Sequence, residues 1–273
     1  MIRFFTSLSI LLIIRLIAQG QDQPTPKDLI STQKGSLPII LSAPHGGKEA
    51  IPDCPERAGK GVEKFVVVRD TNTLELAEKL AARIEKEFKA KPFLVLARFD
   101  RKYADVNRSA EMGYESEKAK PFYEAYHAAL TDACKEVQTD WGRGILLDLH
   151  GQAFTMDTIY RGTRDFKSVK LLQERFGKTA ITGEKSLLGQ LEKKDYRIRP
   201  ANDSDARENM FFSGGYIVDT YGSHQGFGID AIQLEFGANF RMKNKLDQVA
   251  EDLTQSLKVF AKEYLPTEKK KKK

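Results

Sequence analysis

Two histidines that end short apolar runs are the first residues whose surroundings suggest chemistry. His45 follows the run 39–44, and His150 follows the run 144–149. Runs of this length, bounded by proline or glycine, are typical of buried strands in an open α/β sheet, where ligands bind at the carboxyl ends. Because imidazole is a common ligand of catalytic zinc, the pair predicts a Zn²⁺ site. The ring nitrogens must then lie within about 5 Å of each other, since each ligand bond is about 2 Å long.

A carboxylate near the end of the chain is a candidate proton carrier for such a site. Glu235 ends the strand-like run 230–234, where a carboxylate is costly to bury without a partner. Burial would raise its pKa toward neutrality, which suits a general base that takes a proton from water and returns it to a leaving amine. The alternative is a buried ion pair with an arginine.

Arginines gather directly after another apolar run, at 93–97. The planar guanidinium fork matches the two oxygens of a carboxylate, so Arg108 beside Asn107 predicts a grip on a substrate carboxylate. Either Arg98 or Arg101 is then expected to face the oxyanion that develops when an amide is attacked.

Further along the chain, other polar residues are weaker candidates. Arg161 and Arg164 follow the His150 segment and offer a second anion contact, with solvated side chains as the alternative. His224 lies in a glycine-rich loop and is a candidate for contact with the substrate. His127 lies in a helical pattern and is interpreted as a surface or packing residue.

Two aspartates are expected to orient other site residues. Asp148 comes two residues before His150, on the same side of a strand, and is predicted to hold that imidazole. Asp105 is predicted to act in a similar way on Arg108.

Taken in order, these pieces resemble the N-formylglutamate amidohydrolase family. The likeness runs over roughly residues 37–241 and rests on the combined order of the pieces, since each alone is short. The matching pieces are Pro44-His45-Gly46-Gly47, Arg69-Asp70-Thr71, Asp105-Val106-Asn107-Arg108, Asp148-Leu149-His150 and Gln233-Leu234-Glu235.

This resemblance implies a fold related to the zinc carboxypeptidases and deacylases. It also implies a Zn²⁺ held by two histidines and a carboxylate, an Asn-Arg pair for the substrate carboxylate, and a glutamate base. In those carboxypeptidases the carboxylate ligand lies three residues after the first histidine, where this chain has Lys48. Asp70 matches the aspartate of the amidohydrolases and is the predicted third ligand. Glu49 is the alternative ligand, and Asp70 would then only cap the helix that follows it.

The elements that must position these residues alternate between strands and helices. The pattern predicts an α/β fold, with a mostly parallel or mixed twisted sheet flanked by helices, like that of the zinc carboxypeptidases. A single domain over residues 35–265 is expected, because no flexible linker divides it. The expected helices cover 71–89, 117–138, 168–176, 186–193 and 246–264, and the expected later strands cover 158–160, 216–218 and 230–234.

The two ends of the chain predict export and a solvated tail. Residues 1–20 combine Arg3, an apolar stretch and a small-residue ending, which is typical of a secretion signal, with an uncleaved membrane anchor as the alternative. Residues 21–34 are interpreted as a polar lead-in, and residues 266–273 as a disordered lysine tail. This tail and the two arginines of the signal carry more positive charge than the whole net excess of +6. We therefore expect no nucleic-acid partner, and no stable membrane association once the signal is removed.

Together these features predict a secreted or periplasmic, zinc-dependent amidohydrolase. Its substrate would be a small N-acyl amino acid, N-formyl included, or a short peptide that carries a carboxylate. The alternatives are an exported zinc carboxypeptidase or peptide amidase, and a non-catalytic carboxylate-binding protein. Cys54 and Cys134 are the only thiols, and the sequence leaves their pairing open.

Overall fold

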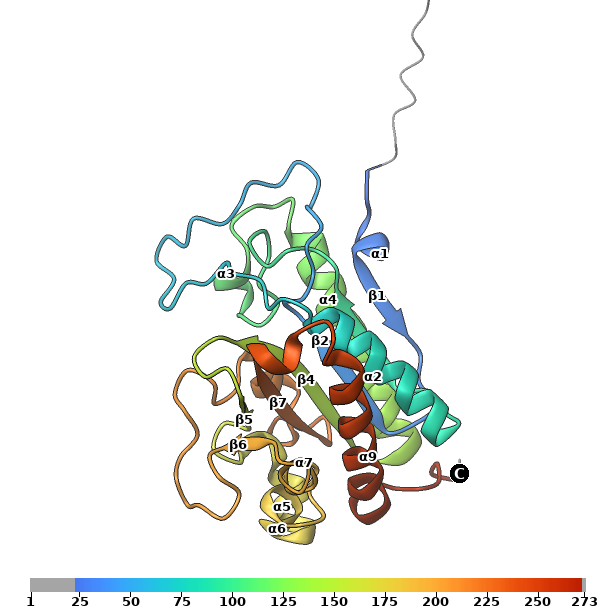
Figure 1. Ribbon diagram of the computed structural model, residues 1–273. Coiled ribbons are helices and arrows are strands. Elements are labelled where there is room, and N and C mark those ends of the chain that lie inside the picture. The colour runs from blue at the N-terminus through green and yellow to red at the C-terminus, as the bar shows by residue number, and fades with distance from the viewer. Residues whose placement is uncertain (1–22, 272–273) are drawn as a thin grey trace, which may run out of the picture.

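The computed structural model describes residues 23–271, which form a seven-stranded sheet with helices on both faces (Figure 1). The predicted secretion signal at residues 1–20 lies outside this range. The strands lie in the order β1-β3-β2-β4-β7-β5-β6. Their bounds are β1 Ile30–Gln33, β2 Ile39–Ala43, β3 Phe93–Ala97, β4 Gly144–Gln152, β5 Thr158–Gly162, β6 Arg197–Arg199 and β7 Ile229–Gly237.

The sheet is mixed, with a parallel centre. Strands β3, β2, β4 and β7 run parallel, whereas β1 pairs antiparallel with β3, and β5 pairs antiparallel with β7. The chain leaves β2 toward β3 on one side and returns to β4 on the other, so the strand order reverses around β2. Ligands bind outside the carboxyl ends of strands at such a switch point. The residues after β2 and at the end of β4 are therefore neighbours at that edge.

Helices cover the sheet in two layers. Helices α2 and α9 pack side by side on one face together with α5, α6 and α7, while α4 and α8 pack on the other (Figure 1). The helices are α1 Pro26–Leu29, α2 Thr73–Phe88, α3 Ala110–Gly113, α4 Lys120–Trp141, α5 Lys170–Phe176, α6 Thr179–Thr182, α7 Leu187–Glu192, α8 Tyr216–Tyr221 and α9 Leu246–Tyr264. Short 3-10 turns are η1 Lys167–Val169, η2 Ser223–Gln225 and η3 Ala238–Arg241. The predicted α/β fold with a mixed sheet flanked by helices is confirmed.

The strongest apolar stripes in the sequence give the longest helices. In α9, the leucines, Val249 and Phe260 recur at the 3.6-residue period and are buried against the sheet and α2. The helix spans the predicted residues 246–264. In α4, Pro121 occupies the first turn, where its missing amide breaks no helical hydrogen bond.

Three segments differ from the expectation. The strand predicted at 216–218 is wrong, because α8 begins there and the Ile217 amide donates to Asn107 Oδ1 at 2.8 Å. The polar lead-in holds β1, whose backbone pairs with the outer edge of β3. Strand β6 was not predicted, since its Arg-Ile-Arg sequence contains one apolar residue and gives no recognisable period.

The structure also describes the two cysteines, the start of the lysine tail and the lengths of the helices. Cys54 and Cys134 are both free. Lys269, at the start of the lysine tail, forms an ion pair of 2.6 Å with Asp140 and lies 4.6 Å from the centre of the Trp141 ring. Within residues 23–271, none of the helices has the length and apolar character needed to cross a bilayer.

Candidate metal centre and active site

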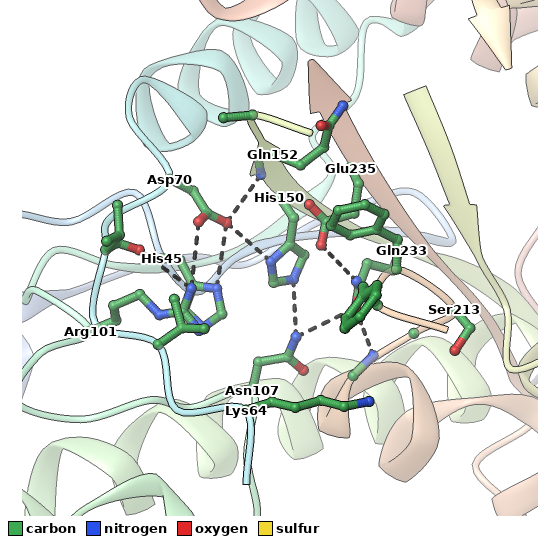
Figure 2. Close-up of a pocket in the computed structure, with 18 of the residues that line it drawn as sticks. His45, Lys64, Asp70, Arg101, Asn107, His150, Gln152, Ser213, Gln233 and Glu235 are labelled. Atoms are coloured by element: carbon green, nitrogen blue, oxygen red, sulfur yellow. Dashed lines mark hydrogen bonds and ion pairs between the residues drawn. The ribbon is translucent and has the colours of Figure 1, made fainter. Parts of the chain in front are cut away.

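A cavity of about 560 Å³ opens at the carboxyl ends of the central strands. His45 reaches it from the turn after β2, His150 from the end of β4 and Glu235 from the end of β7. The register of β4 against β7 places His150 directly beside Glu235. Figure 2 shows these side chains and Asp70 turned toward one another. The sheet therefore brings together residues that lie up to 190 positions apart in the chain.

The two histidines and Asp70 meet at one point. Asp70 Oδ2 lies 3.5 Å from His45 Nδ1 and 3.3 Å from His150 Nδ1. All three candidate ligand atoms lie within 4.8 Å of one another. The spacing that a shared ion requires is met.

The other ring nitrogen of each histidine is held by a carboxylate. His45 Nε2 lies 2.7 Å from Asp105 Oδ1, and His150 Nε2 lies 2.8 Å from Asp148 Oδ2. Asp148 orients His150, as the sequence predicted. Asp105 differs from the expectation, because it holds His45 closely while Arg108 Nε is 4.0 Å away. With protons on both Nε2 atoms, each Nδ1 turns a lone pair toward Asp70.

This arrangement fits a bound cation. His45 Nδ1 is buried and makes no hydrogen bond within the described chain, although it faces the Asp70 oxygen. His45 Nδ1, His150 Nδ1 and Asp70 Oδ2 converge with no proton between them. Buried lone pairs that face one another in this way are unfavourable unless a positive ion lies among them. Two imidazoles and one carboxylate, with the second ring nitrogens tied to carboxylates, are a donor set typical of catalytic zinc.

The backbone around Asp70 fixes its direction. Its amide donates to the carbonyl of His45 at 3.0 Å, and its Oδ2 accepts from the Gly151 amide at 3.0 Å. Burial raises the pKa of Asp70, but the neighbouring His150 and His45 rings outweigh it and bring the pKa below its ordinary range.

Neither alternative from the sequence, Asp70 as a helix cap or Glu49 as the third ligand, agrees with the structure. Helix α2 begins at Thr73, after Asn72, so Asp70 is not its N-cap residue. Glu49 is exposed and forms a backbone bridge with Phe99, outside the residues that line the cavity.

Two glycines after His45 allow other backbone segments to approach closely. A Cβ atom on Gly46 would collide with the backbone of Leu74 in α2, and one on Gly47 would collide with the backbone of Arg98. The Pro-His-Gly-Gly sequence thus places the start of α2 and the end of β3 against the His45 turn. Asp70 is carried to the site by that contact.

Glu235 is buried beside the three candidate ligands. Burial raises the pKa of its carboxyl to about 7, against the opposing effect of the neighbouring His150. Its Oε1 accepts a hydrogen bond of 2.9 Å from Gln233 Nε2. The alternative interpretation, an ion pair with an arginine, is not seen for Glu235 among residues 23–271. A carboxyl with a pKa near 7 can both accept and donate a proton at neutral pH.

Arg101, Asn107, Arg108 and Arg164 also line the cavity. Arg101 is buried and donates to Asp105 at 2.6 Å, while its Nη1 lies 3.6 Å from Asp70 Oδ1. Asn107 Nδ2 lies 3.3 Å from His150 Nε2. Arg108 and Arg164 are more exposed, and their guanidinium groups are accessible to a ligand that enters from solvent.

The structure does not bring three of the sequence candidates to the cavity. Arg98 points to the α2 side and pairs with Glu78 at 2.7 Å. Arg161 is not a solvated loop residue but is fully buried in β5, with Glu208 at 2.9 Å. His224 lies 3.5 Å from Asp219 and is not among the residues that line the cavity.

His127 has the packing role that the sequence predicted. It lies in α4 among aromatic rings, and its Nδ1 lies 3.0 Å from the hydroxyl of Tyr221. Burial lowers the pKa of His127 to about 4, so it is neutral at physiological pH.

Gln233 is a site residue to which the sequence gave no role. Its Oε1 accepts from the Gly215 amide at 2.8 Å, which orients its amide group so that Nε2 donates to Glu235. The available signal was its position two residues before Glu235, on the same face of a strand. Arg241 was also missed, and it binds the carbonyls of Phe236 and Gln152 at 3.0 Å each.

Comparison with known proteins gives a likeness in fold. No protein-family profile and no curated protein sequence matches the chain. The structure is similar to the crystal structure of N-formylglutamate amidohydrolase from Ralstonia eutropha JMP134, with a TM-score of 0.58 and 19% identity over 87% of this chain and 98% of that one. It is also similar to a gene product of Agrobacterium tumefaciens, with a TM-score of 0.57 and 13% identity over 86% and 95% of the two chains. The resemblance inferred from the sequence motifs is thus confirmed at the level of the fold.

Proposed function

We propose that this protein is a zinc-dependent amidohydrolase of the N-formylglutamate amidohydrolase type. Its substrate would be a small N-acyl amino acid, or a similar amide that carries a carboxylate. One observation carries the proposal, namely the convergence of His45 Nδ1, His150 Nδ1 and Asp70 Oδ2 within 4.8 Å beside the buried Glu235.

His45, Asp70 and His150 would hold the metal. A zinc ion bound there supplies Lewis-acid activation of water and of the amide carbonyl. Asp105 and Asp148 keep the two imidazoles in the tautomer that presents Nδ1 to the cavity.

Glu235 is the proposed proton carrier. Its carboxylate takes a proton from the attacking water and delivers it to the nitrogen of the leaving amine, which needs a group with a pKa near the working pH. Gln233 donates to Oε1 at 2.9 Å and so fixes the orientation of that carboxylate.

Arginines of the cavity are proposed to bind the charges of the substrate. Arg108, together with Asn107, holds the substrate carboxylate, and Arg164 offers a second cationic contact. Arg101 is the proposed contact for the developing oxyanion, since Arg98 lies outside the cavity. The Arg101 guanidinium already holds Asp105, so its position is fixed before a substrate arrives.

The decisive experiment combines metal analysis with product analysis. The full chain, purified without chelator, should contain about one zinc per molecule and should release formate from N-formylglutamate at a rate abolished by chelation. Release of an amino acid from the carboxyl end of a peptide would instead favour a carboxypeptidase. Protein that binds no zinc, and is not stabilised when zinc is added, would support the non-catalytic carboxylate-binding alternative.

Export is a separate proposal that rests on residues 1–20. The apolar stretch from Phe4 to Ala18, followed by Gln19 and Gly20, supports a cleaved signal and a secreted or periplasmic protein without a stable membrane contact. Amino-terminal sequencing of the exported protein should find the first residue close to 21. A product that stays in the membrane fraction and begins at Met1 would support the anchored alternative.

A further inference from the structure

Bulky apolar side chains are concentrated at the mouth of the cavity. Val66, Val68, Met210 and Phe211 are four of the eight large hydrophobic residues that are exposed within the described chain, and all four line the cavity. Val68 is 73% exposed, Met210 68% and Phe211 63%. Apolar side chains exposed together are costly in water and mark binding surfaces. We call these four residues the apolar rim.

The apolar rim is built by two long loops that meet across the cavity. One loop joins β2 to α2 and the other joins β6 to α8, and both project from the same side of the molecule (Figure 1). The ammonium of Lys64 on the first loop lies 5.2 Å from the centre of the Phe211 ring on the second. In Figure 2, Lys64 and Ser213, which belong to these loops, lie on the side of the cavity away from Asp70.

Aromatic surface continues from the rim along one wall. Phe212 lines the cavity next to Phe211, and its ring centre lies 4.7 Å from that of Tyr160 and 6.1 Å from that of Phe154. Phe154 is itself 68% exposed. Through Phe212, the apolar lining of the cavity thus extends toward the exposed Phe154.

The floor of the same cavity has the opposite character. It holds the candidate metal ligands, Glu235 and Asn107, all of them buried and polar. At about 560 Å³ the cavity falls within the range that binds drug-sized ligands, about 300–1,000 Å³. N-formylglutamate is much smaller than such ligands and has no apolar group that would cover the rim.

We propose that the substrate is amphipathic, with a bulky apolar group attached to the amide in addition to its carboxylate. This proposal rests on the proposed function and names the substrate class of that same site. The carboxylate and the scissile amide occupy the polar floor, and the apolar group covers the rim. Continuity between rim and floor is the reason for assigning the rim to the substrate rather than to a partner protein or a lipid surface.

The test compares three amides on the zinc-loaded full chain. N-formylglutamate is the reference, N-octanoylglutamate carries an apolar group on its acyl side, and N-formylphenylalanine carries one on its amino-acid side. We expect kcat/KM for at least one apolar amide to exceed that for the reference by about tenfold or more, because several methylene groups or a ring leave water. The amide that gains shows which end of the substrate covers the rim.

A double variant links this gain to the rim. Met210→Ala with Phe211→Ala should reduce the ratio of kcat/KM between the preferred apolar amide and N-formylglutamate by about tenfold. Met242→Ala is the matched control, since Met242 is 44% exposed but does not line the cavity, and it should leave that ratio unchanged.

The outcomes separate this inference from the proposed function. If N-formylglutamate is cleaved at least as efficiently as both apolar amides, the amphipathic substrate is overturned while amide hydrolysis stands. A preference that survives in the double variant also overturns the assignment, and leaves the rim to a protein or lipid partner. If none of the three amides is hydrolysed, the proposed function fails, and this inference fails with it.

Discussion

Asp105 lies 2.7 Å from His45 and Asp148 lies 2.8 Å from His150, so each of the two histidine ligands proposed for the metal is held by its own carboxylate. Partners of this kind raise the basicity of the imidazole and fix its ring, and their removal typically lowers metal affinity about 10- to 100-fold. We expect that loss in Asp148→Asn, measured as the zinc dissociation constant by chelator competition. Asp203→Asn, at an exposed position outside the cavity, is the control. An affinity equal to that of the wild type would show that Asp148 does not support a metal ligand.

Asp70 and Glu49 give opposite expectations as the third ligand. Asp70→Ala should lower zinc affinity by at least about 100-fold, because it removes one of three protein ligands. Glu49→Gln should have no effect on zinc, since its exposed side chain lies outside the cavity. Zinc content after dialysis measures both. The reverse pattern would return the role to Glu49.

Glu235→Gln should separate metal binding from turnover. The substitution keeps the shape of the side chain and its contact with Gln233, but it removes the proton acceptor. We expect kcat to fall by at least about 100-fold while zinc stays bound, in line with the usual contribution of general acid–base catalysis. Glu78→Gln, which removes an acid paired with Arg98 on the α2 side, is the control. Turnover near the wild-type rate would exclude Glu235 as the proton carrier.

Arg98 and Arg108, which both follow β3 in the chain, should also behave differently. Arg108→Ala removes the proposed grip on the substrate carboxylate, so we expect kcat/KM to fall about 10- to 100-fold, as for a lost charge-assisted contact. Arg98→Ala should leave kcat/KM within about twofold, because an exposed ion pair contributes little. Steady-state kinetics on N-formylglutamate would show both effects. Equal losses in the two variants would contradict the placement of Arg98.

Asp230 should make stability depend on pH. Burial raises its pKa to about 6 from 3.8, so the folded state binds this proton more tightly than the unfolded state. The contribution of this protonated carboxyl to the free energy of unfolding is therefore present below pH 3.8 and is lost as the pH rises through 6. The difference between the two pKa values corresponds to about 3 kcal/mol.

Asp230→Asn should remove this dependence. The amide oxygen can still accept from the Leu172 amide, as Oδ1 now does at 3.0 Å. We expect the variant to gain unfolding free energy relative to the wild type between pH 4 and pH 7, as measured by urea denaturation. A difference that does not change over this range would contradict the raised pKa.

Much of the fold could be predicted because the spacing of apolar residues within a single segment identifies many of its helices and strands. The apolar stripes of α2 and α9 and the uninterrupted run of β3 need no distant partner to be recognised. By contrast, α8 was predicted as a strand because residues 216–218 are β-branched or aromatic, and the side chain that receives the start of this helix, Asn107, lies 110 residues away. Strand β1 is polar and is defined by its pairing with β3, which no local pattern reveals.

For the site, strand ends were a good guide to position but not to direction. His45, His150 and Glu235 reach the cavity from strand ends or from the turn that follows one, whereas Asp70 reaches it from the end of the long loop before α2. Arg98 also follows a strand, yet its side chain turns toward α2. Arg161 turns into the interior, where Glu208 meets it from a segment 47 residues later. Such partners are set by tertiary packing, which spacing in the sequence does not record.

Strand β1 has a practical consequence for where the protein can be shortened. A chain that starts at residue 35, the domain boundary taken from the sequence, would lack the strand that covers β3. The bared strand reads Phe-Leu-Val-Leu-Ala, without a charge or proline to discourage pairing with other molecules. Expression of such a fragment should yield aggregates, whereas a start at residue 23 keeps β3 paired with β1.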